Sequence, residues 1–385
     1  MNVLALNSGS SSLKFGLYDV RSVSVAPLVS GQAEAIGEAN SRFHAEDSRR
    51  GVVASEADSI ADQRGAVLRL VQLLATLGFP SPAAVGHRIV HGGPKLRRHC
   101  RIDDAVLREL EAATPYAPLH MPPALAVIRF AEEHFPGIAQ VACFDTTFHA
   151  GMPEVSRTLA IPKELRSQGI RRYGFHGLSC ESIVRQLADR LPGRLLIAHL
   201  GNGASVTAVG DGRSIDTSMG LTPSGGLIMG TRSGDLDPGV LIYLLREKGF
   251  DAGRLEDMVD HRAGLLGISG VAGDMRRLHE QAAANDDARL AIEMFCYSVR
   301  KELAAMTAVL GGVEAIVFTG GIGENDPDVR SAICAGLAWA GIRLDESRNR
   351  ASNGGLISEP SSSCAVHVLA SQEDEQIARH AAVLL

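Results

Sequence analysis

The chain of 385 residues has few cysteines, no clustered positive charge and no long apolar run. The cysteines show no C-x-x-C spacing, which argues against zinc sites and disulfides and indicates reduced thiols in a cytoplasm. They are Cys100, Cys143, Cys180, Cys296, Cys334 and Cys364. No run reaches the roughly 18 apolar residues of a membrane helix. The start of the chain lacks a basic segment, so we expect no signal peptide. A net charge of −6 gives no reason to expect a nucleic-acid partner.

The composition, 45% hydrophobic and 21% charged, is ordinary for a globular protein, and the length allows two domains. Segments with strand and helix character alternate, which predicts an α/β fold with partly parallel sheets. Predicted strands cover residues 84–90, 138–144, 158–161, 195–198, 205–209, 315–319 and 365–369, and residues 30–58 are predicted to hold a strand pair with a loop. Predicted helices cover residues 60–77, 103–113, 122–135, 177–191, 237–248, 286–310 and 326–340, with a closing helix after Glu373.

A glycine turn, Gly201-Asn202-Gly203, separates two apolar runs and predicts a β-hairpin. A Gly-, Ser- and Thr-rich segment with Arg232 follows it. Glycines let backbone N–H groups approach an anion, and hydroxyl groups and arginine add donors. A phosphate-binding segment is therefore one interpretation, and a plain surface hairpin is the alternative.

The N-terminal residues repeat this pattern at an offset of 192. The alignment places Asn7 on His199, Gly9 on Gly201, Leu17 on Val209 and Asp19 on Asp211. The repeat indicates an internal duplication, with two copies facing a cleft that binds ATP. A third glycine loop, residues 320–325, follows the predicted strand 315–319 and precedes a helix that begins at Asp326-Pro327.

Four charged residues stand out as candidates for chemistry. Arg88 and Arg232 lie in apolar, glycine-rich surroundings, where a structural ion pair is the alternative role. Asp145 follows a predicted strand, and ligands of open α/β sheets bind outside the carboxyl ends of strands. Glu373 suits Mg²⁺, although a helix also favours a carboxylate in its first turn. Together they favour phosphoryl transfer, in which catalysis is largely positioning and charge neutralisation.

Histidines gather near the glycine turns, and none forms the H-x-x-x-H pair of a helical metal site. For most of them a buried structural role is the more common one, and His176, which opens a predicted helix beside Phe175, is the best functional candidate. The histidines in question are His87, His91, His120, His149, His176 and His199.

Nine motifs now carry a resemblance to the acetate kinase family. They are LNSGSSSLKF (6–15), GHRIVHGG (86–93), PLHMP (118–122), FDTTFH (144–149), YGFHG (173–177), HLGNGAS (199–205), MGTRSGDLDPG (229–239), FTGGIGEN (318–325) and SQEDEQIARH (371–380). The resemblance implies an α/β fold with two domains of duplicated ribonuclease H-like fold and a central nucleotide cleft, as in sugar kinases, Hsp70 and actin. The domains would be residues 1–150, with a final helix 374–385 packed back on them, and residues 151–373. It also implies a cytoplasmic homodimer.

The resemblance implies the reaction ATP + acetate ⇌ ADP + acetyl phosphate, with Mg²⁺ or Mn²⁺. Catalytic positions are Asp145, Arg88, Arg232 and His176, the last two stabilising the transition state. Substrate contacts are Arg88 and His120, together with the residues of the pocket for the methyl group, Val90, Leu119, Phe175 and Pro223. Nucleotide contacts are Asn7, Ser10, Ser12, Lys14, His199, Gly201, Asn202, Gly203, Asp274, Met275, Arg276, Gly321, Ile322, Gly323 and Asn325. Metal ligands are Asn7 and Glu373. The chain departs from the family pattern at Met121, at Ala272-Gly273 and at Gln372.

Two alternatives remain at this stage. A propionate or butyrate kinase of the same family would carry the same motifs. An actin- or Hsp70-like ATPase would carry the phosphate turns, but it would not need Arg88, Arg232 and a small apolar pocket between them.

Overall fold

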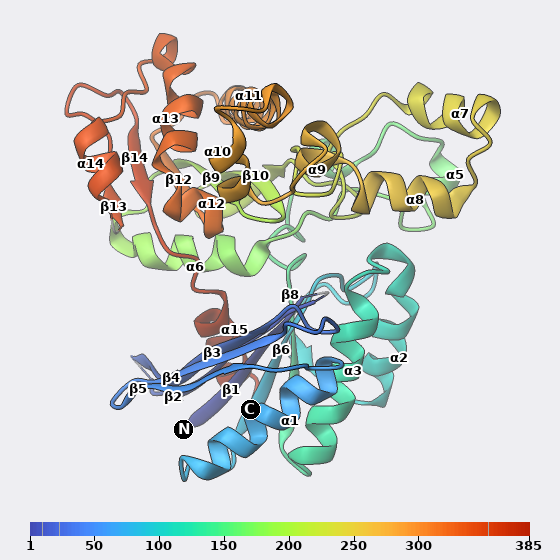
Figure 1. Ribbon diagram of the computed structural model, residues 1–385, viewed down its shortest axis with the longest axis vertical. Helices are drawn as coiled ribbons and strands as arrows, with labels where there is room; N and C mark the ends of the chain where they lie inside the picture. The colour runs from blue at the N-terminus through green and yellow to red at the C-terminus, as the bar shows by residue number, and fades with distance from the viewer. Residues whose placement is uncertain (10, 23, 353) are drawn as a thin grey trace. The chain divides into compact units, whose positions relative to one another are not determined.

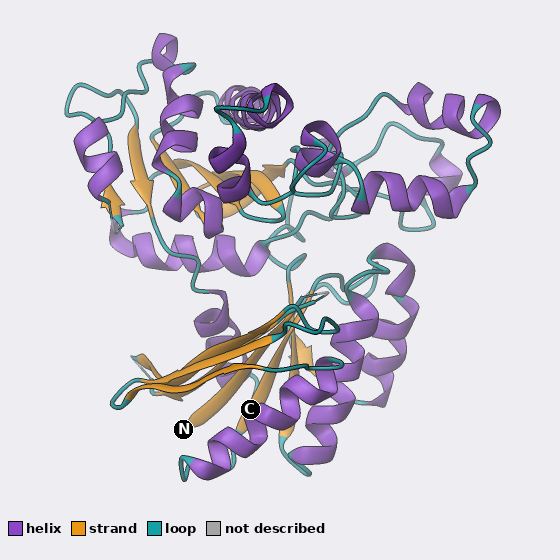
Figure 2. Ribbon diagram, in the orientation of Figure 1, coloured by secondary structure: helices purple, strands orange, loops and turns teal. Residues whose placement is uncertain are grey.

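The computed structural model describes residues 1–385 except residues 10, 23 and 353. By internal contacts the chain divides into two compact units. The first unit holds residues 1–150, 177–182 and 372–385, and the second holds residues 151–176 and 183–371. The predicted domains differ from these units at residues 177–182 and 372–373, and the domain assignment stays a prediction. Each unit is an α/β structure with its own sheet (Figures 1 and 2).

The elements follow one another as strands and helices along most of the chain. The strands are β1 (Asn2–Ser8), β2 (Leu13–Val20), β3 (Val25–Glu34), β4 (Arg42–Asp47), β5 (Gly51–Ala57), β6 (Ala84–Ile89), β7 (Cys100–Arg101), β8 (Ala139–Phe144), β9 (Arg194–Leu200), β10 (Ala204–Gly210), β11 (Arg213–Thr217), β12 (Ala315–Thr319), β13 (Gly355–Leu356) and β14 (Ala365–Val368). The α-helices are α1 (Gln63–Thr76), α2 (Asp104–Ala112), α3 (Met121–His134), α4 (Glu154–Arg157), α5 (Lys163–Arg166), α6 (Gly177–Leu187), α7 (Pro238–Glu247), α8 (Ala252–His261), α9 (Gly264–Ser269), α10 (Met275–Gln281), α11 (Asp286–Val309), α12 (Gly320–Asn325), α13 (Pro327–Ala335), α14 (Glu346–Ala351) and α15 (Glu373–Val383). The 3₁₀ turns are η1 (Thr114–Tyr116), η2 (Ala188–Arg190) and η3 (Ala338–Ala340).

The two sheets share one arrangement of five strands. The sheet of the first unit has the order β5-β4-β3-β2-β1-β6-β8-β7, and that of the second has the order β11-β10-β9-β12-β14-β13. In both, a three-stranded antiparallel meander is continued by two parallel strands: β3-β2-β1-β6-β8 in one and β11-β10-β9-β12-β14 in the other. Both predicted hairpins are confirmed, and the repeated order agrees with the predicted duplication.

The strand register corrects the predicted alignment of the two hairpins. In the first unit Leu6 lies opposite Phe15, and in the second Ala198 lies opposite Val206. The offset is therefore 198 − 6 = 192 in the first strand but 206 − 15 = 191 in the return strand. The second turn, residues 201–203, is one residue shorter than residues 9–12. Matching Leu17 with Val209 and Asp19 with Asp211 is thus wrong by one position, because the turn shortened.

Strand β1 shows why both faces of the first sheet are covered. Successive side chains of a strand point to opposite faces. Leu4 and Leu6 join the core cluster that includes residues of α1 and α3, whereas Val3 and Ala5 join the cluster that includes residues of α15. All four side chains are at most 1% exposed. Figure 1 shows α1 and α3 on one face of this sheet and α15 on the other.

In the second unit, the long helix α11 packs along the sheet. It contacts β9, β10 and β11 and also packs against α9, α10 and α13. Asn285 caps its start by accepting hydrogen bonds from the N–H groups of Asp287 and Ala288, and the helix ends before Gly311-Gly312. The predicted helix 286–310 is confirmed.

Most other predicted elements are confirmed to within a few residues, and four differ from the structure. Residues 158–161 form no strand; the N–H of Ile161 bonds to the carbonyl of Leu159, and Pro162 explains the extended, strand-like pattern. Residues 320–325 are the short helix α12 rather than a loop, and the next helix ends at Ala335 instead of residue 340. Residues 30–58 contain parts of three strands, not two.

Among the described residues, no helix combines the length and the apolar composition needed to span a bilayer.

Candidate active site

In the first unit, the predicted catalytic residues Arg88 and Asp145 form a buried ion pair. Nε and Nη2 of Arg88 both donate to Oδ2 of Asp145, at 3.0 and 2.7 Å. Arg88 lies near the end of β6, and the backbone N–H of Asp145 bonds to the carbonyl of Ile89, which fixes the chain directly after β8. The Asp145 side chain is 0% exposed and that of Arg88 is 17% exposed. The parallel pairing of β6 and β8 therefore brings these two residues together.

The pKa values of Asp145 and Arg88 are both raised, but for different reasons. Burial raises the pKa of Asp145 to about 6, although the Arg88 charge opposes this increase. Burial alone would lower the pKa of Arg88, but the charges of Asp145, Glu373 and Asp374 outweigh it and raise that pKa. The second oxygen of Asp145, Oδ1, is buried and has no hydrogen-bond partner among the described residues. A buried polar atom without a partner is costly, so Oδ1 is suited to meet a ligand.

Asn7 connects this pair to the start of α15. Its Oδ1 accepts from Nη1 of Arg88 at 3.2 Å, and its Nδ2 donates to Oε2 of Glu373 at 3.0 Å and to Oδ1 of Asp374 at 2.9 Å. Burial raises the pKa of Asp374, and the charge of Glu373 raises it further. Two carboxylates thus converge on one amide group, and a concentration of oxygen donors of this kind suits a hard divalent cation.

Gly177 fixes the backbone of Asp145 from the start of α6. Its N–H donates to the carbonyl of Asp145 at 2.9 Å. A Cβ at this position would lie only 2.2 Å from that oxygen, so this close approach requires glycine.

The remaining predicted residues of the first unit lie around β1, β2 and α3. Lys14 pairs with Asn7 across the β1–β2 ladder, and its charge acts on Asp374. The carbonyl of Ser12 accepts from the N–H of Gly9. Ser10 lies outside the described residues. His120 precedes the first residue of α3.

The two predicted methyl-pocket residues of this unit differ in burial. Leu119 is partly exposed, whereas Val90 is buried at 4% exposure. Val90 follows the end of β6, so strand alternation does not determine where its side chain points.

In the second unit, His176 and Arg232 gather around Gly203. His176 adopts the left-handed conformation (φ 58°) before α6, which is uncommon for a residue other than glycine. Its Nδ1 lies 2.9 Å from Oγ of Ser205, and its ring stacks on His199 with centroids 4.1 Å apart. A Cβ on Gly203 would lie 3.2 Å from Nε2 of His176 and 3.4 Å from Nη1 of Arg232. A side chain at position 203 would therefore crowd both His176 and Arg232.

Arg232 is held by the segment that precedes it. Nη1 donates to the carbonyl of Pro223 at 3.2 Å and contacts Sδ of Met229 at 3.7 Å. Pro223 and Phe175 are buried, the latter at 1% exposure. Of the four predicted methyl-pocket residues, Val90 and Leu119 thus belong to the first unit, and Phe175 and Pro223 to the second.

A cavity of about 470 Å³ lies wholly within the second unit. Its lining is Gly201, Asn202, Gly273, Asp274, Met275, Arg276, Gly321, Ile322, Asn325 and Asp326. Eight of these ten residues were predicted as nucleotide contacts; Gly273 and Asp326 were not. The size is in the usual range of ligand pockets. Gly323, also predicted, is buried in α12 and does not line the cavity.

The sequence interpretation missed Asp374, although it follows Glu373 directly. Acidic residues in the first turn of a helix are stabilised by the helix dipole wherever they occur, so the run Glu373–Glu375 carried no distinctive signal. Asp326 was interpreted only as a helix cap. It does cap α13, but it also accepts from Nε2 of His279 at 2.8 Å and lines the cavity.

His99, Glu181 and His380 of the first unit meet closely enough to hold a metal ion. Nδ1 of His99 accepts from the backbone N–H of Phe144 at 3.0 Å, so the ring proton is on Nε2, which faces Glu181 at 3.4 Å. A metal would have to displace that proton. Burial would raise the pKa of Glu181, but its bonds to His380 and His99 lower it to about 2. Nε2 of His380 lies 2.6 Å from Oε2 of Glu181, whereas Nε2 of His99 faces Glu181 without a well-aligned hydrogen bond.

Comparisons with known proteins agree with this arrangement. An acetate kinase of Heliobacterium modesticaldum is 40% identical over 98% of this chain and 98% of that protein. A solved propionate kinase of Francisella tularensis superposes with a TM-score of 0.91, at 38% identity over the full length of both chains. A Porphyromonas gingivalis acetate kinase superposes with a TM-score of 0.87, at 35% identity over 100% of this chain and 99% of that one.

The α/β fold with two similar sheets is that of the actin-like ATPases, and the similarity to these kinases shows that the protein is a phosphotransferase of this fold. The family model for the acetokinase family matches residues 2–379, and the chain belongs to that family.

Proposed function

We propose that the protein transfers a phosphoryl group reversibly from ATP to acetate and gives ADP and acetyl phosphate. An acetate oxygen forms a bond to the γ-phosphorus, and the bond from that phosphorus to the β–γ bridging oxygen breaks. The observation that carries the proposal is the buried pair of Arg88 and Asp145, which leaves one carboxylate oxygen of Asp145 without a partner. In an ATPase without a carboxylate substrate, this pair would be only a structural ion pair.

Arg88 is proposed to bind the acetate carboxylate. Its guanidinium is fixed by Asp145 on one side and by Asn7 on the other. A guanidinium held in this way binds a carboxylate with little further loss of freedom. Asp145 orients Arg88 and balances its charge.

The cavity of the second unit is proposed to bind the nucleotide. Backbone groups of Gly201, Asn202 and Gly321 suit the phosphates, and Asp274 to Arg276 suit the nucleoside. Arg232 and His176 would neutralise the charge that develops on the equatorial phosphoryl oxygens, because such charge is the main target of catalysis in phosphoryl transfer.

Mg²⁺ fits the oxygen donors at the start of α15. Glu373 and Asp374 would hold it, with Asn7 alongside, and the ion would neutralise phosphate charge when bound. Asn7 donates from Nδ2 to both carboxylates while its Oδ1 accepts from Arg88, so it holds the two carboxylates beside the guanidinium.

The proposal places the enzyme in the cytoplasm as a homodimer. All six cysteines are thiols, which suits a reducing compartment. Large apolar side chains are exposed on α7 and α11, including Tyr243 (52%) and Tyr297 (58%), as expected of a surface that another subunit covers. Light scattering that gives the mass of a single 40.7 kDa chain across a wide concentration range would reject the dimer.

Trapping of acyl phosphate with hydroxylamine tests the reaction. The purified protein, ATP and Mg²⁺ are incubated with acetate, propionate, butyrate or no acid. We expect hydroxamate with acetate, less with propionate and none without acid. ATP hydrolysis that does not depend on acid and yields no hydroxamate would support the actin-like ATPase alternative. A higher kcat/KM for propionate would assign the chain to its propionate kinase relatives.

A further inference from the structure

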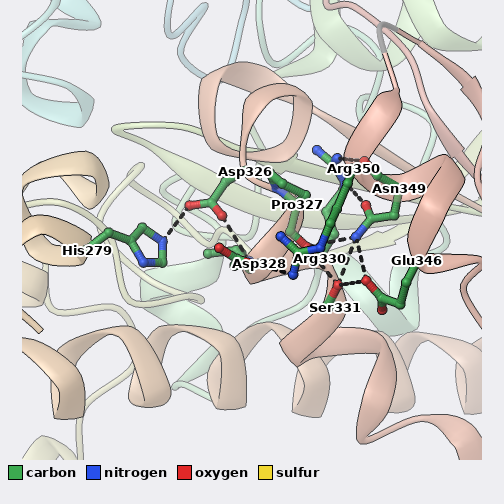
Figure 3. Close-up of polar contacts among 10 residues, drawn as sticks. His279, Asp326, Pro327, Asp328, Arg330, Ser331, Glu346, Asn349 and Arg350 are labelled. Atoms are coloured by element: carbon green, nitrogen blue, oxygen red, sulfur yellow. Dashed lines mark hydrogen bonds and ion pairs between the residues drawn. The ribbon is translucent and has the colours of Figure 1, made fainter. Parts of the chain in front are cut away.

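A fully buried arginine lies directly behind the short helix α12. Arg330, in α13, is 1% exposed, although arginine is rarely buried unless it is paired. Nη1 donates to the carbonyls of Gly323 and Glu324, both at 2.9 Å. Nη2 and Nε donate to the carbonyl and to Oδ1 of Asn349, both at 2.8 Å. Figure 3 shows Arg330 and Asn349 within this network.

Helix α12 needs such support because it is only six residues long. A helix of this length is not stable by itself, since it forms too few internal hydrogen bonds. Its second, third and last residues, Gly321, Ile322 and Asn325, nevertheless line the cavity. The shape of that wall must therefore be imposed by contacts outside the helix.

The side chains of Glu324, within α12, and of Arg330, in α13, connect the two ends of α12 to the rest of the unit. At the start, Oε1 of Glu324 accepts from the N–H groups of Gly320 and Ser371, both at 2.9 Å, and ties α12 to the end of β14. At the end, Arg330 binds the carbonyls of the last turn, where a positive charge also suits the helix dipole.

Asn349 in turn holds Arg330. It accepts from Arg330, and its Nδ2 donates to the carbonyl of Pro327 at 2.9 Å and to Oγ of Ser331 at 2.8 Å. Its side chain is 0% exposed. Asn349, Arg330 and Gly323 are thus all buried, and direct hydrogen bonds link Asn349 through Arg330 to α12.

We propose that Arg330 and Asn349 are positioning residues that hold α12 in the conformation that binds the nucleotide. This inference rests on the proposed function, which assigns the cavity to ATP. Arg330 touches no substrate; it acts through the backbone of Gly323 and Glu324. A displacement of about 1 Å in a positioning group can lower a reaction rate about 10²-fold. Because this support acts on the wall of the nucleotide cavity, its loss should weaken nucleotide binding far more than acetate binding.

The test uses Arg330→Met, Arg330→Lys, Asn349→Ala and the milder Ser331→Ala. Arg194→Met is the matched control, because Arg194 also binds a backbone carbonyl of the second unit, that of Gly311, but lies away from the cavity. ADP affinity is measured by calorimetry, and KM for ATP and acetate by steady-state kinetics. Melting temperatures and circular dichroism report folding.

We expect Arg330→Met to weaken ADP binding and raise KM for ATP by about tenfold or more, with KM for acetate within about twofold of wild type. Arg330→Lys keeps the positive charge but cannot reach all four acceptors, so it should show a smaller effect in the same direction. Asn349→Ala leaves Arg330 in place and should also show a smaller effect. Arg194→Met should lower the melting temperature without changing ADP affinity. If Arg330→Met does not fold, the folded Arg330→Lys, Asn349→Ala and Ser331→Ala variants decide the question.

Folded variants with wild-type ADP affinity would overturn the inference, as would equal rises in KM for ATP and acetate. The proposed function fails differently. If wild type itself does not bind ADP, or if Asn325→Ala in the cavity wall leaves ADP affinity unchanged, the cavity is not the nucleotide site.

Discussion

The two units carry the same five strands, yet the residues at the ends of those strands differ in kind. The register matches Leu6 with Ala198 and His87 with Phe318. One residue further along, Asn7 therefore corresponds to His199, and Arg88 corresponds to Thr319. By the same register, Asp145 after β8 corresponds to Ser371 after β14.

The first unit offers charged side chains at its strand ends, whereas the second offers mainly backbone groups. In the first unit, charged side chains meet at the strand ends, and Arg88 pairs with Asp145. In the second unit, the positions that correspond to Arg88 and Asp145 are the small, polar Thr319 and Ser371, and Gly320 begins a helix directly after β12. A small carboxylic acid can be held by one guanidinium. A polyphosphate needs many donors at close range, which glycine backbone supplies. Under the proposed function, one repeated topology therefore binds two kinds of ligand.

The largest effect should come from Asp145→Asn. The amide keeps the shape but loses the charge that fixes Arg88, and we expect kcat to fall by about 10³-fold or more, at the upper end of the effect of single electrostatic groups. Initial rates of hydroxamate formation measure it. Ser371→Ala, at the matched position of the second unit, is the control and should change kcat by less than about threefold, if charge at this position matters only in the first unit. An unfolded Asp145→Asn protein, seen by circular dichroism, would make Asp145 structural.

Arg88→Ala and Arg232→Ala should each reduce kcat by about 10²–10³-fold. They should differ in stability. Loss of Arg88 leaves the fully buried Asp145 without its cation, and breaking a buried pair costs about 3–5 kcal/mol. Arg232 donates to a carbonyl instead, so its loss should cost less. Urea unfolding and steady-state kinetics of both variants measure the contrast. Near-normal turnover in either one contradicts its proposed role.

As the pH falls, the enzyme should lose activity while the protein around Asp145 stays folded. Burial raises the pKa of Asp145 to about 6, so its carboxylate gains a proton as the pH falls through 6. A raised pKa means that the ionised form costs stability above pH 6 and that this cost disappears toward pH 4, so this group does not promote acid unfolding. We expect kcat/KM for acetate to fall about tenfold per pH unit below about 6. A flat profile from pH 7 to 5, in protein shown to be folded, would remove Asp145 from the mechanism.

Some of this site was predictable from the sequence, and the reason differs between the units. A glycine turn can be recognised from a few neighbouring residues, so Gly201, Asn202 and Gly321 could be predicted to line the nucleotide cavity. Charged partners far apart in sequence depend on strand pairing. The contact between Arg88 and Asp145 follows from β6 lying beside β8, which single-residue patterns do not encode. Arg330 was missed for the same reason, because its partner Asn349 lies in a separate helix and nothing in the local pattern marks either residue as buried.

The smallest effect concerns the acyl chain. Arg88 lies in β6, whereas Val90 lies just beyond the strand, buried at 4% exposure. A valine is stiff at χ1 and cannot readily move aside for a longer acid. Since a pocket discriminates one methylene by about 1–3 kcal/mol, acetate should be preferred over propionate by about tenfold to a hundredfold. Val90→Ala removes two carbons and should narrow that ratio several-fold, mainly through KM for propionate. If Val90 is only core, the variant loses stability, about 0.8 kcal/mol for each buried carbon, and the ratio stays constant. Measuring kcat/KM for both acids, with the unfolding free energy of each protein, distinguishes a residue of the acid pocket from one that merely fills the first unit.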